Sequence, residues 1–357
     1  MTGQTPGARI AVVVIDDSAF MRRAIQKMLE ADPAIRVVGT AASGEEGIAM
    51  TERLRPDVVT MDVEMPGMSG VEAARAIVER RGPPVIMVSA LTREGAQTTL
   101  RALEAGAVDF IPKPDSALID IVNVQRELIG KVLHFGVRRA SQRAMRTPRA
   151  APAPRMAAAV RTAPFACVAI GTSTGGPVAL SRILTRLPAA FPLPIVVVQH
   201  MPPGFTRPLA ERLDAASAIS VVEGADAMPL EPGTAIVAPA GAELRVRRAG
   251  GAVRVALSPG SGESLHVPSV DAMAASVAET YGAGALGVIL TGMGHDGVDG
   301  LRVLKERGGY VLGQDEASSV VYGMPRAAAS AGLVDRVVAL DAVAPALCEL
   351  AGAETEG

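Results

Sequence analysis

Short apolar runs alternate with amphipathic segments along residues 9–130 of this 357-residue chain. The amphipathic segments, such as SAFMRRAIQKMLEAD and GVEAARAIVERRG, repeat apolar residues at helical spacing. Strands that alternate with helices in this way are typical of a parallel, doubly wound sheet. We therefore predict an α/β fold with five strands, which the sequence places at 9–17, 35–41, 57–65, 84–90 and 107–114.

A basic stretch, residues 136–164, interrupts this alternation. It contains seven arginines and no acidic residue, and it is rich in alanine and proline. Such a composition is typical of a linker that is helical at its start and extended where proline accumulates. A nucleic-acid-binding arm is the alternative, but no aromatic residues are interleaved with the arginines. We predict a first domain over 1–130, a basic Ala/Pro-rich linker over 131–163 and a second domain over 164–357.

The alternation resumes in the C-terminal half. The runs FACVAIG, PIVVVQH and ALGVILTG have the character of buried strands, and PVALSRILTRLP and SVDAMAASVAETYG that of helices. Four further runs look like short strands or hairpins inserted into this layout, at 219–223, 233–240, 243–248 and 252–258. The second domain is therefore predicted to be a doubly wound α/β domain with inserted short strands.

Composition excludes several classes of protein. The formal net charge is −2, so broad affinity for nucleic acid is not expected. The two cysteines, Cys167 and Cys348, cannot form a disulfide framework. The N-terminus lacks a basic region followed by an apolar one, and no apolar run approaches the ~20 residues that span a bilayer. We expect a cytoplasmic protein that neither binds nucleic acid nor inserts directly into the membrane.

Polar side chains stand at the carboxyl ends of the predicted strands of the first domain. Asp16 and Asp17 end the first strand, and Asp62 ends the third. Ligands of doubly wound sheets collect at this edge, and carboxylates that converge there are suited to Mg²⁺. Ser89 and Lys113 end the next two strands and can hold phosphoryl oxygens. Together these residues predict a phosphoacceptor site, although any single one could be a helix N-cap.

The motifs DDSAFMR, MDVEMPGMSG, VSA and IPKP make this half similar to the receiver domains of response regulators. The resemblance implies that Asp62 accepts a phosphoryl group from a histidine kinase. It also implies that Asp16 and Asp17, together with Asp62, bind Mg²⁺. Ser89 and Lys113 are by the same resemblance the residues that sense the phosphoryl group.

The stretch VAIGTSTGGP, residues 168–177, contains the G-x-S-x-G pattern of a nucleophilic serine on a sharp strand-to-helix turn. The pattern leaves three interpretations open: Ser173 is a nucleophile, the glycine-rich turn is an anion cradle, or the segment is a plain turn and N-cap. The lysine of a phosphate-binding loop does not follow. A general base at the same edge of the sheet would favour the nucleophile.

Two residues that follow neighbouring runs are candidates for that base and for the acid that orients it. His200 comes directly after the predicted strand PIVVVQ, at the same edge as Ser173, whereas the other three histidines end the first domain or lie in loops. Asp296 follows the run ALGVILTG and is closer to the strand end than Asp299. These observations predict a Ser173–His200–Asp296 triad, in a chain order that differs from that of α/β-hydrolases.

The motifs IGTSTGGP, VVVQHMPPGFT, HVPSVD, ILTGMGHDG and GMPRA make residues 165–348 resemble the CheB family of chemotaxis methylesterases. The resemblance implies hydrolysis of glutamate γ-methyl esters on the cytoplasmic domains of methylated chemoreceptors, and deamidation of receptor glutamines, as part of chemotaxis adaptation. It implies a chemotaxis histidine kinase as phosphodonor and no cofactor in the esterase site. As oxyanion donors we expect the backbone N–H groups of Thr174 and Met293. Val267 and Ala274 depart from the family pattern and leave receptor preference open.

Two other functions are alternatives at this point. A receiver could be coupled to a binding or DNA-regulating domain, but such a domain would need a helix-turn-helix and a basic recognition face. A hydrolase of small esters could use the same triad. Methanol release from methylated receptor membranes would distinguish these possibilities.

Overall fold

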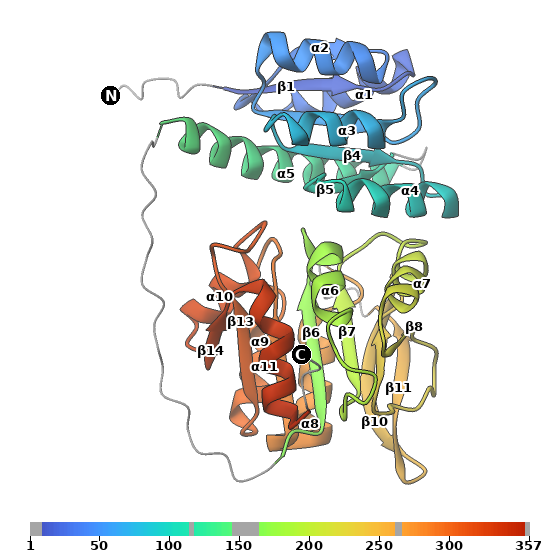
Figure 1. Ribbon diagram of the computed structural model, residues 1–357, viewed down its shortest axis with the longest axis vertical. Coiled ribbons are helices and arrows are strands. Elements are labelled where there is room, and N and C mark those ends of the chain that lie inside the picture. The colour runs from blue at the N-terminus through green and yellow to red at the C-terminus, as the bar shows by residue number, and fades with distance from the viewer. Residues whose placement is uncertain (1–8, 114–117, 145–163, 261–265, 354–357) are drawn as a thin grey trace. The chain divides into compact units, whose positions relative to one another are not determined.

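The structure, a computed structural model, describes residues 9–113, 118–144, 164–260 and 266–353 (Figure 1). The chain divides into two compact units, residues 1–151 and 152–357. Each unit contains its own parallel sheet flanked by helices, as the alternation in the sequence predicts.

Unit 1 is a five-stranded parallel sheet with the order β2-β1-β3-β4-β5. Its helices pack in two groups, α1 with α5, and α2 through α3 to α4. All strands except the largely unburied β2 are buried runs, and all five match the predicted ones: β1 (Ile10–Ile15), β2 (Ile35–Ala41), β3 (Val58–Asp62), β4 (Val85–Ser89) and β5 (Asp109–Pro112). The helices are α1 (Ala19–Leu29), α2 (Gly44–Leu54), α3 (Gly70–Glu79), α4 (Arg93–Glu104) and α5 (Leu118–Ala144).

The loop after β3 is held tightly against the strand end. Ser69 and Glu72 form a capping box that begins α3, with the Ser69 side chain accepting from the Glu72 N–H. A Cβ on Gly70 would lie 1.8 Å from the carbonyl oxygen of Asp62, so only glycine fits there. This close approach fixes the backbone next to the Asp62 carboxylate.

A buried ion pair ties α5 to the sheet. Lys131 Nζ lies 3.0 Å from Asp109 on β5 and 2.7 Å from Glu127, and it donates to the Phe110 carbonyl at 2.7 Å. Burial disfavours the charged lysine, but the two carboxylates outweigh it and raise the pKa of Lys131. The helix runs past residue 130, where we placed the end of the first domain, and continues to Ala144.

Unit 2 is a seven-stranded parallel sheet with the order β14-β13-β12-β6-β7-β9-β8. Its strands are β6 (Cys167–Thr172), β7 (Ile195–Gln199), β8 (Ser220–Glu223), β9 (Thr234–Val237), β12 (Ala285–Ile289), β13 (Tyr310–Gln314) and β14 (Arg336–Val338). Its helices are α6 (Gly176–Leu184), α7 (Thr206–Ala216), α8 (Val270–Tyr281), α9 (Val298–Glu306), α10 (Met324–Ser330) and α11 (Leu340–Ala351), with a short 3₁₀ turn at Gly282–Gly284.

The four runs predicted as short strands or hairpins all form strands, in two different arrangements. The strands β10 (Ala242–Ala249) and β11 (Ala252–Pro259) form the expected separate antiparallel hairpin, which packs on α8. In contrast, β8 and β9 extend the parallel sheet beyond β7. The reason is that Ala235, Ile236 and Val237 of β9 are fully buried, which fits a strand inside a sheet better than an inserted ribbon.

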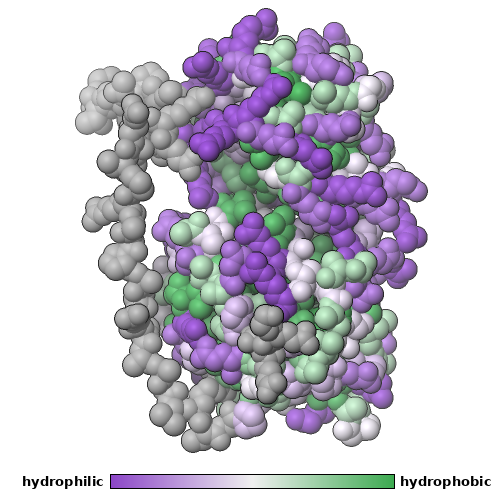
Figure 2. All heavy atoms as spheres, in the orientation of Figure 1, coloured by the Kyte–Doolittle hydropathy of each residue, from purple (hydrophilic) through white to green (hydrophobic). Residues whose placement is uncertain are grey.

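The core of unit 2 is aliphatic, as a chain without tryptophan requires. Buried valine, leucine, isoleucine and alanine side chains of the sheet pack with Met273 and Val277 of α8. Figure 2 shows hydrophilic side chains gathered over unit 1, in which Phe20 and Val122 are among the few large apolar residues exposed. No helix among the described residues is both long and apolar enough to cross a membrane.

Candidate phosphoacceptor and active sites

Three carboxylates meet at the carboxyl edge of the unit 1 sheet. Asp16 and Asp17 follow β1, and Asp62 is the last residue of β3, the neighbouring strand. One oxygen from each of the three lies within 4.8 Å of the others. Asp16 and Asp62 are buried and Asp17 is exposed, so the cluster opens to solvent on one side.

Lys113 reaches into this cluster from the end of β5. Its Nζ lies 2.8 Å from Asp62 Oδ2 and 3.7 Å from Asp16 Oδ2. Although partial burial works against its charge, the three carboxylates raise the pKa of Lys113. Burial and the Asp62 charge raise the pKa of Asp16 to about 6, and burial raises that of Asp62 against the opposing effect of Lys113.

The donor set fits a hard divalent cation. Asp16 Oδ2 is buried and has no hydrogen-bond partner among the described residues, although Asp16 Oδ1 accepts from the Ser18 N–H at 2.9 Å. An orphaned buried carboxylate oxygen beside two further carboxylates matches the oxygen ligands that Mg²⁺ takes. Ser89 is buried at the end of β4, with Oγ 3.2 Å from the Ala90 carbonyl and 3.3 Å from that of Gly95.

In unit 2, the three residues predicted as a triad leave three adjacent strands, β12, β6 and β7. Ser173 follows β6 and His200 follows β7, directly after the register pair Thr172 and Gln199. The His200 N–H donates to the Thr172 carbonyl at 3.1 Å, which joins the two strand ends. Asp296 lies in the loop after β12, on the other side of β6.

The structure brings His200 and Asp296 into direct contact. His200 Nε2 lies 2.7 Å from Asp296 Oδ2, and the two side chains are 8% and 13% exposed. A carboxylate at this distance selects the tautomer with the proton on Nε2. His200 Nδ1 is buried and has no hydrogen-bond partner in the described part of the chain. Its lone pair is therefore the one available to accept a proton.

Asp296 is itself held by the N-terminus of α8. It accepts hydrogen bonds from the Ser269 hydroxyl at 3.0 Å, the Val270 N–H at 2.8 Å and the Asp271 N–H at 3.1 Å. Burial acts to raise its pKa, but the hydrogen bonds from His200 and from the helix outweigh burial and hold the pKa well below the ordinary range. Asp296 is therefore an ionised partner for the imidazole.

The turn that carries Ser173 is packed without spare room. The Ser173 N–H donates to the Thr291 carbonyl at 3.1 Å, and the Ser173 carbonyl accepts from Gln199 Nε2 at 2.9 Å. A Cβ on Gly176 would lie 1.8 Å from Gln199 Oε1, and one on Gly292 would lie 2.9 Å from Ser173 Cβ. The glycines of GTSTGG and TGMG thus permit close approach of the backbone at this turn.

Threonine side chains join this turn to the loop that follows β12, the strand beside β6. Thr172 Oγ1 donates to the Thr291 carbonyl, and Thr291 Oγ1 donates to the Thr174 carbonyl, both at 2.9 Å. The Thr291 N–H in turn donates to Gln314 Oε1 at 2.8 Å. Sequence reasoning did not single out Thr291 or Gln314, although Gln314 ends β13 and Thr291 closely follows β12, which is the same signal that located the other site residues. Met293 follows Gly292 at this edge, and the oxyanion roles of Thr174 and Met293 stay predictions.

Sequence reasoning also missed the neighbours of the predicted triad. The rings of His200 and His266 stack, with centroids 4.2 Å apart and planes 19° from parallel. Asp271 accepts from the Gly300 N–H at 2.7 Å, and burial together with the Asp296 charge raises its pKa to about 6. His266, Ser269 and Asp271 all lie within the motif HVPSVD, and this motif was the sequence signal that could have identified them. Asp299, the rejected alternative to Asp296, is exposed.

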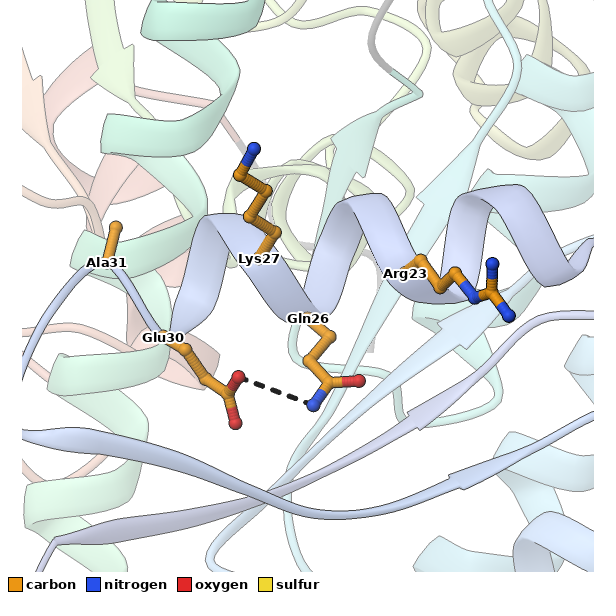
Figure 3. A pocket seen from close by; sticks show the side chains of 5 residues that line it. All are labelled: Arg23, Gln26, Lys27, Glu30 and Ala31. Atoms are coloured by element: carbon orange, nitrogen blue, oxygen red, sulfur yellow. Dashed lines mark hydrogen bonds between the residues drawn. The ribbon is translucent and has the colours of Figure 1, made fainter.

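A pocket on α1 is separate from both groups of residues. Figure 3 shows its lining, which comes from a single helix and its C-terminal end: Arg23, Gln26, Lys27, Glu30 and Ala31. Gln26 Nε2 donates to Glu30 Oε2 at 3.3 Å across this surface. The pocket contains none of the predicted site residues.

Comparisons with known proteins agree with this architecture. The family model described as CheB methylesterase matches residues 168–347, and the one described as response regulator receiver domain matches residues 12–123. A protein-glutamate methylesterase/protein-glutamine glutaminase 1 of Oleidesulfovibrio alaskensis is 47% identical, over 95% of this chain and 98% of its own. The corresponding protein of Geobacillus kaustophilus is 46% identical, over 96% and 99%. The crystal structure of the Thermotoga maritima CheB methylesterase catalytic domain matches with a TM-score of 0.51 and 40% identity, over 53% of this chain and all of that one.

Proposed function

The chain belongs to the CheB methylesterase family, and from this premise we propose that Ser173, His200 and Asp296 are the residues with which it hydrolyses glutamate γ-methyl esters on chemoreceptors. The observation that carries the assignment is the contact of His200 with Asp296 through Nε2, which leaves a buried Nδ1 lone pair. Ser173 directly follows β6, which pairs with β7, so it lies at the same edge of the sheet as His200. A nucleophile, a base and an acid that orients the base are thereby available at one place.

The proposed reaction forms and then breaks an acyl-enzyme. Ser173 Oγ attacks the γ-carbonyl carbon of the methylated glutamate while its proton passes to His200 Nδ1. The imidazolium, stabilised by Asp296, then gives that proton to the methoxy oxygen, and methanol leaves. Water attacks the glutamyl ester with His200 again as base, which releases glutamate and restores Ser173. The N–H groups of Thr174 and Met293 are the proposed donors to the oxyanion.

The same acyl-enzyme accounts for action on glutamine. With a γ-amide in place of the ester, His200 would protonate the departing nitrogen and ammonia would leave. Relatives carry the name protein-glutamine glutaminase beside protein-glutamate methylesterase, which supports both activities for this chain.

The N-terminal receiver places this activity under phosphorylation. In the proposed site, a carboxylate oxygen of Asp62 takes the phosphoryl group from a histidine kinase. Asp16, Asp17 and Asp62 are the residues that would hold Mg²⁺, which neutralises phosphoryl oxygens when it is bound. Lys113, now beside Asp62, and Ser89 at the neighbouring strand end would bind phosphoryl oxygens afterwards.

The decisive experiment is methanol release from membranes that carry methylated chemoreceptors. We expect release by the full-length chain, faster with a small phosphodonor and Mg²⁺, and no release above background by Ser173→Ala. Hydrolysis of small esters without release from receptors would contradict the proposed substrate. Release by Ser173→Ala at the wild-type rate would contradict the proposed nucleophile.

A further inference from the structure

One short segment contacts two members of the proposed triad. His266 stacks on the His200 ring, and three residues further along Ser269 donates to Asp296, followed by the N–H groups of Val270 and Asp271. The contacts of the Val270 and Asp271 N–H groups with Asp296 belong to the start of α8 and are accounted for by capping of that helix. The contact with His200 is not required by any secondary structure, since His266 lies in the loop before the helix.

The hydrogen bonds of His200 do not by themselves fix the plane of its ring. Its backbone is held by the Thr172 carbonyl and by Gln199 Nε2, which donates to the His200 carbonyl at 2.9 Å. Within the described part of the chain, its ring is hydrogen-bonded at Nε2, to Asp296, and not at Nδ1. The χ2 torsion of histidine is broad, so one contact near the end of the ring does not fix the direction of Nδ1.

The His266 ring, which is stacked on one face of the His200 ring, opposes a change in the direction of Nδ1. At 4.2 Å between centroids and 19° between planes, the His266 ring lies in contact with the face of the His200 ring. His266 is exposed whereas the His200 side chain is 8% exposed, so His266 also covers the base from solvent. Any tilt of His200 that moved Nδ1 out of line would have to displace the His266 ring.

We propose that His266 is a positioning residue that holds the imidazole plane of His200, so that the direction of the Nδ1 lone pair is fixed when His200 accepts the Ser173 proton. The inference rests on the proposed function, because it assigns a role only if His200 is the base. It requires a flat ring at position 266 and does not require that ring to carry or exchange a proton. A phenylalanine should therefore serve where an alanine fails.

The test compares His266→Ala and His266→Phe in the full-length chain. Methanol release from methylated receptor membranes is measured against receptor concentration, with the small phosphodonor and Mg²⁺ present throughout. For His266→Ala we expect kcat to fall by ~10- to 100-fold, the size of effect that misplacement of a catalytic group produces. KM should stay within about twofold, because a loss confined to the transition state does not alter uniform binding. His266→Phe should recover most of the lost kcat.

His295→Ala is the matched control, since His295 is an exposed histidine in the loop next to Asp296 and contacts neither ring. It should leave kcat and KM unchanged. A wild-type kcat in His266→Ala, an equal loss in His266→Phe, or a change confined to KM would each overturn the proposal. Failure of the proposed function looks different, because then the wild-type chain would itself release no methanol.

Discussion

Lys113 Nζ lies 2.8 Å from Asp62 Oδ2, so the proposed phosphoacceptor is paired with a cation before any phosphoryl group arrives. The pair is held where β3 and β5 end on either side of β4. A phosphoryl group on Asp62 would bring new anionic oxygens to the same ammonium. The lysine is therefore placed to exchange one negative partner for another, and such an exchange on phosphorylation would give the unit two states.

Replacement of Asp62 should uncouple the esterase from the phosphodonor. In Asp62→Asn the carboxylate nucleophile is lost, so a small phosphodonor with Mg²⁺ should no longer accelerate methanol release, whereas the rate without phosphodonor should equal that of the wild type. Initial rates with and without phosphodonor measure this. Glu64→Gln, an exposed change two residues away, is the control and should retain the acceleration. Persistent acceleration in Asp62→Asn would point to another acceptor.

The proposed triad should behave as a single unit under mutation. Ser173→Ala and His200→Ala should each lower kcat by roughly 10³-fold or more, and the double variant should be little worse than either. The quantity to compare is the rate of methanol release at saturating receptor. If the two losses multiplied in the double variant, the residues would be acting independently and the assignment would be wrong.

Mg²⁺ binding to unit 1 should weaken as the pH falls through about 6. The pKa of Asp16 is raised to about 6 by burial and by Asp62, so this carboxyl is ionised above that pH and protonated below it. Mg²⁺ requires ionised ligands, and a cation that binds only the folded state stabilises it. At a Mg²⁺ concentration tenfold above the Kd at pH 8, the added stability should be about 1.4 kcal/mol at pH 8 and should fall to about 0.4 kcal/mol at pH 5.

The change in stability is measured by thermal unfolding of the full chain in Mg²⁺ and, as the control, in NaCl of the same ionic strength. Asp16→Asn should abolish the Mg²⁺-dependent rise in Tm at every pH. A Mg²⁺ effect that stayed constant between pH 8 and 5 would show that Asp16 is not among the ligands.

Ser269 should matter to catalysis beyond its part in helix capping. Ser269→Ala removes the hydroxyl that donates to Asp296 and that also accepts from the Ala272 N–H at 3.4 Å. Loss of an N-cap costs about 1 kcal/mol. Because the acid of the proposed triad also loses a donor, we expect kcat to fall ~10-fold in addition.

The matched control is Ser43→Ala, which removes the N-cap of α2, whose hydroxyl accepts from the Glu46 N–H at 3.3 Å. It should lower stability by a similar amount without any effect on methanol release in the absence of phosphodonor. Equal kcat values for the two variants would mean that Ser269 has only a capping role.

The residues that the sequence could place are those that end buried strands. Asp16, Asp62, Ser173 and His200 each stand at or directly after a run of apolar residues, and parallel pairing brings such positions to one edge whatever the loops do. The order of the strands was not predictable in the same way. Neither the position of β12 beside β6 nor the entry of β8 and β9 into the parallel sheet has a local signal, since short buried strands and inserted strands have the same composition.

The supporting contacts escaped prediction because they depend on tertiary structure. The carboxylate of Asp296 reaches the N-terminus of α8, which precedes it in the chain, and only the packed fold sets that distance. The stacking of His266 on His200 has the same origin. A histidine in a loop carries no periodicity from which such a contact could be predicted.

The adjacency of β12, β6 and β7 has a consequence for the time at which activity appears during synthesis. Ser173 and His200 leave the ribosome well before Asp296, and β12 must pair with β6 before the last residue of the proposed triad reaches the other two. A nascent or truncated chain that ends before residue 285 therefore has a complete receiver but an incomplete esterase. The regulatory half is made first, so a product shortened at its C-terminal end before residue 285 retains the receiver but lacks the acid of the proposed triad.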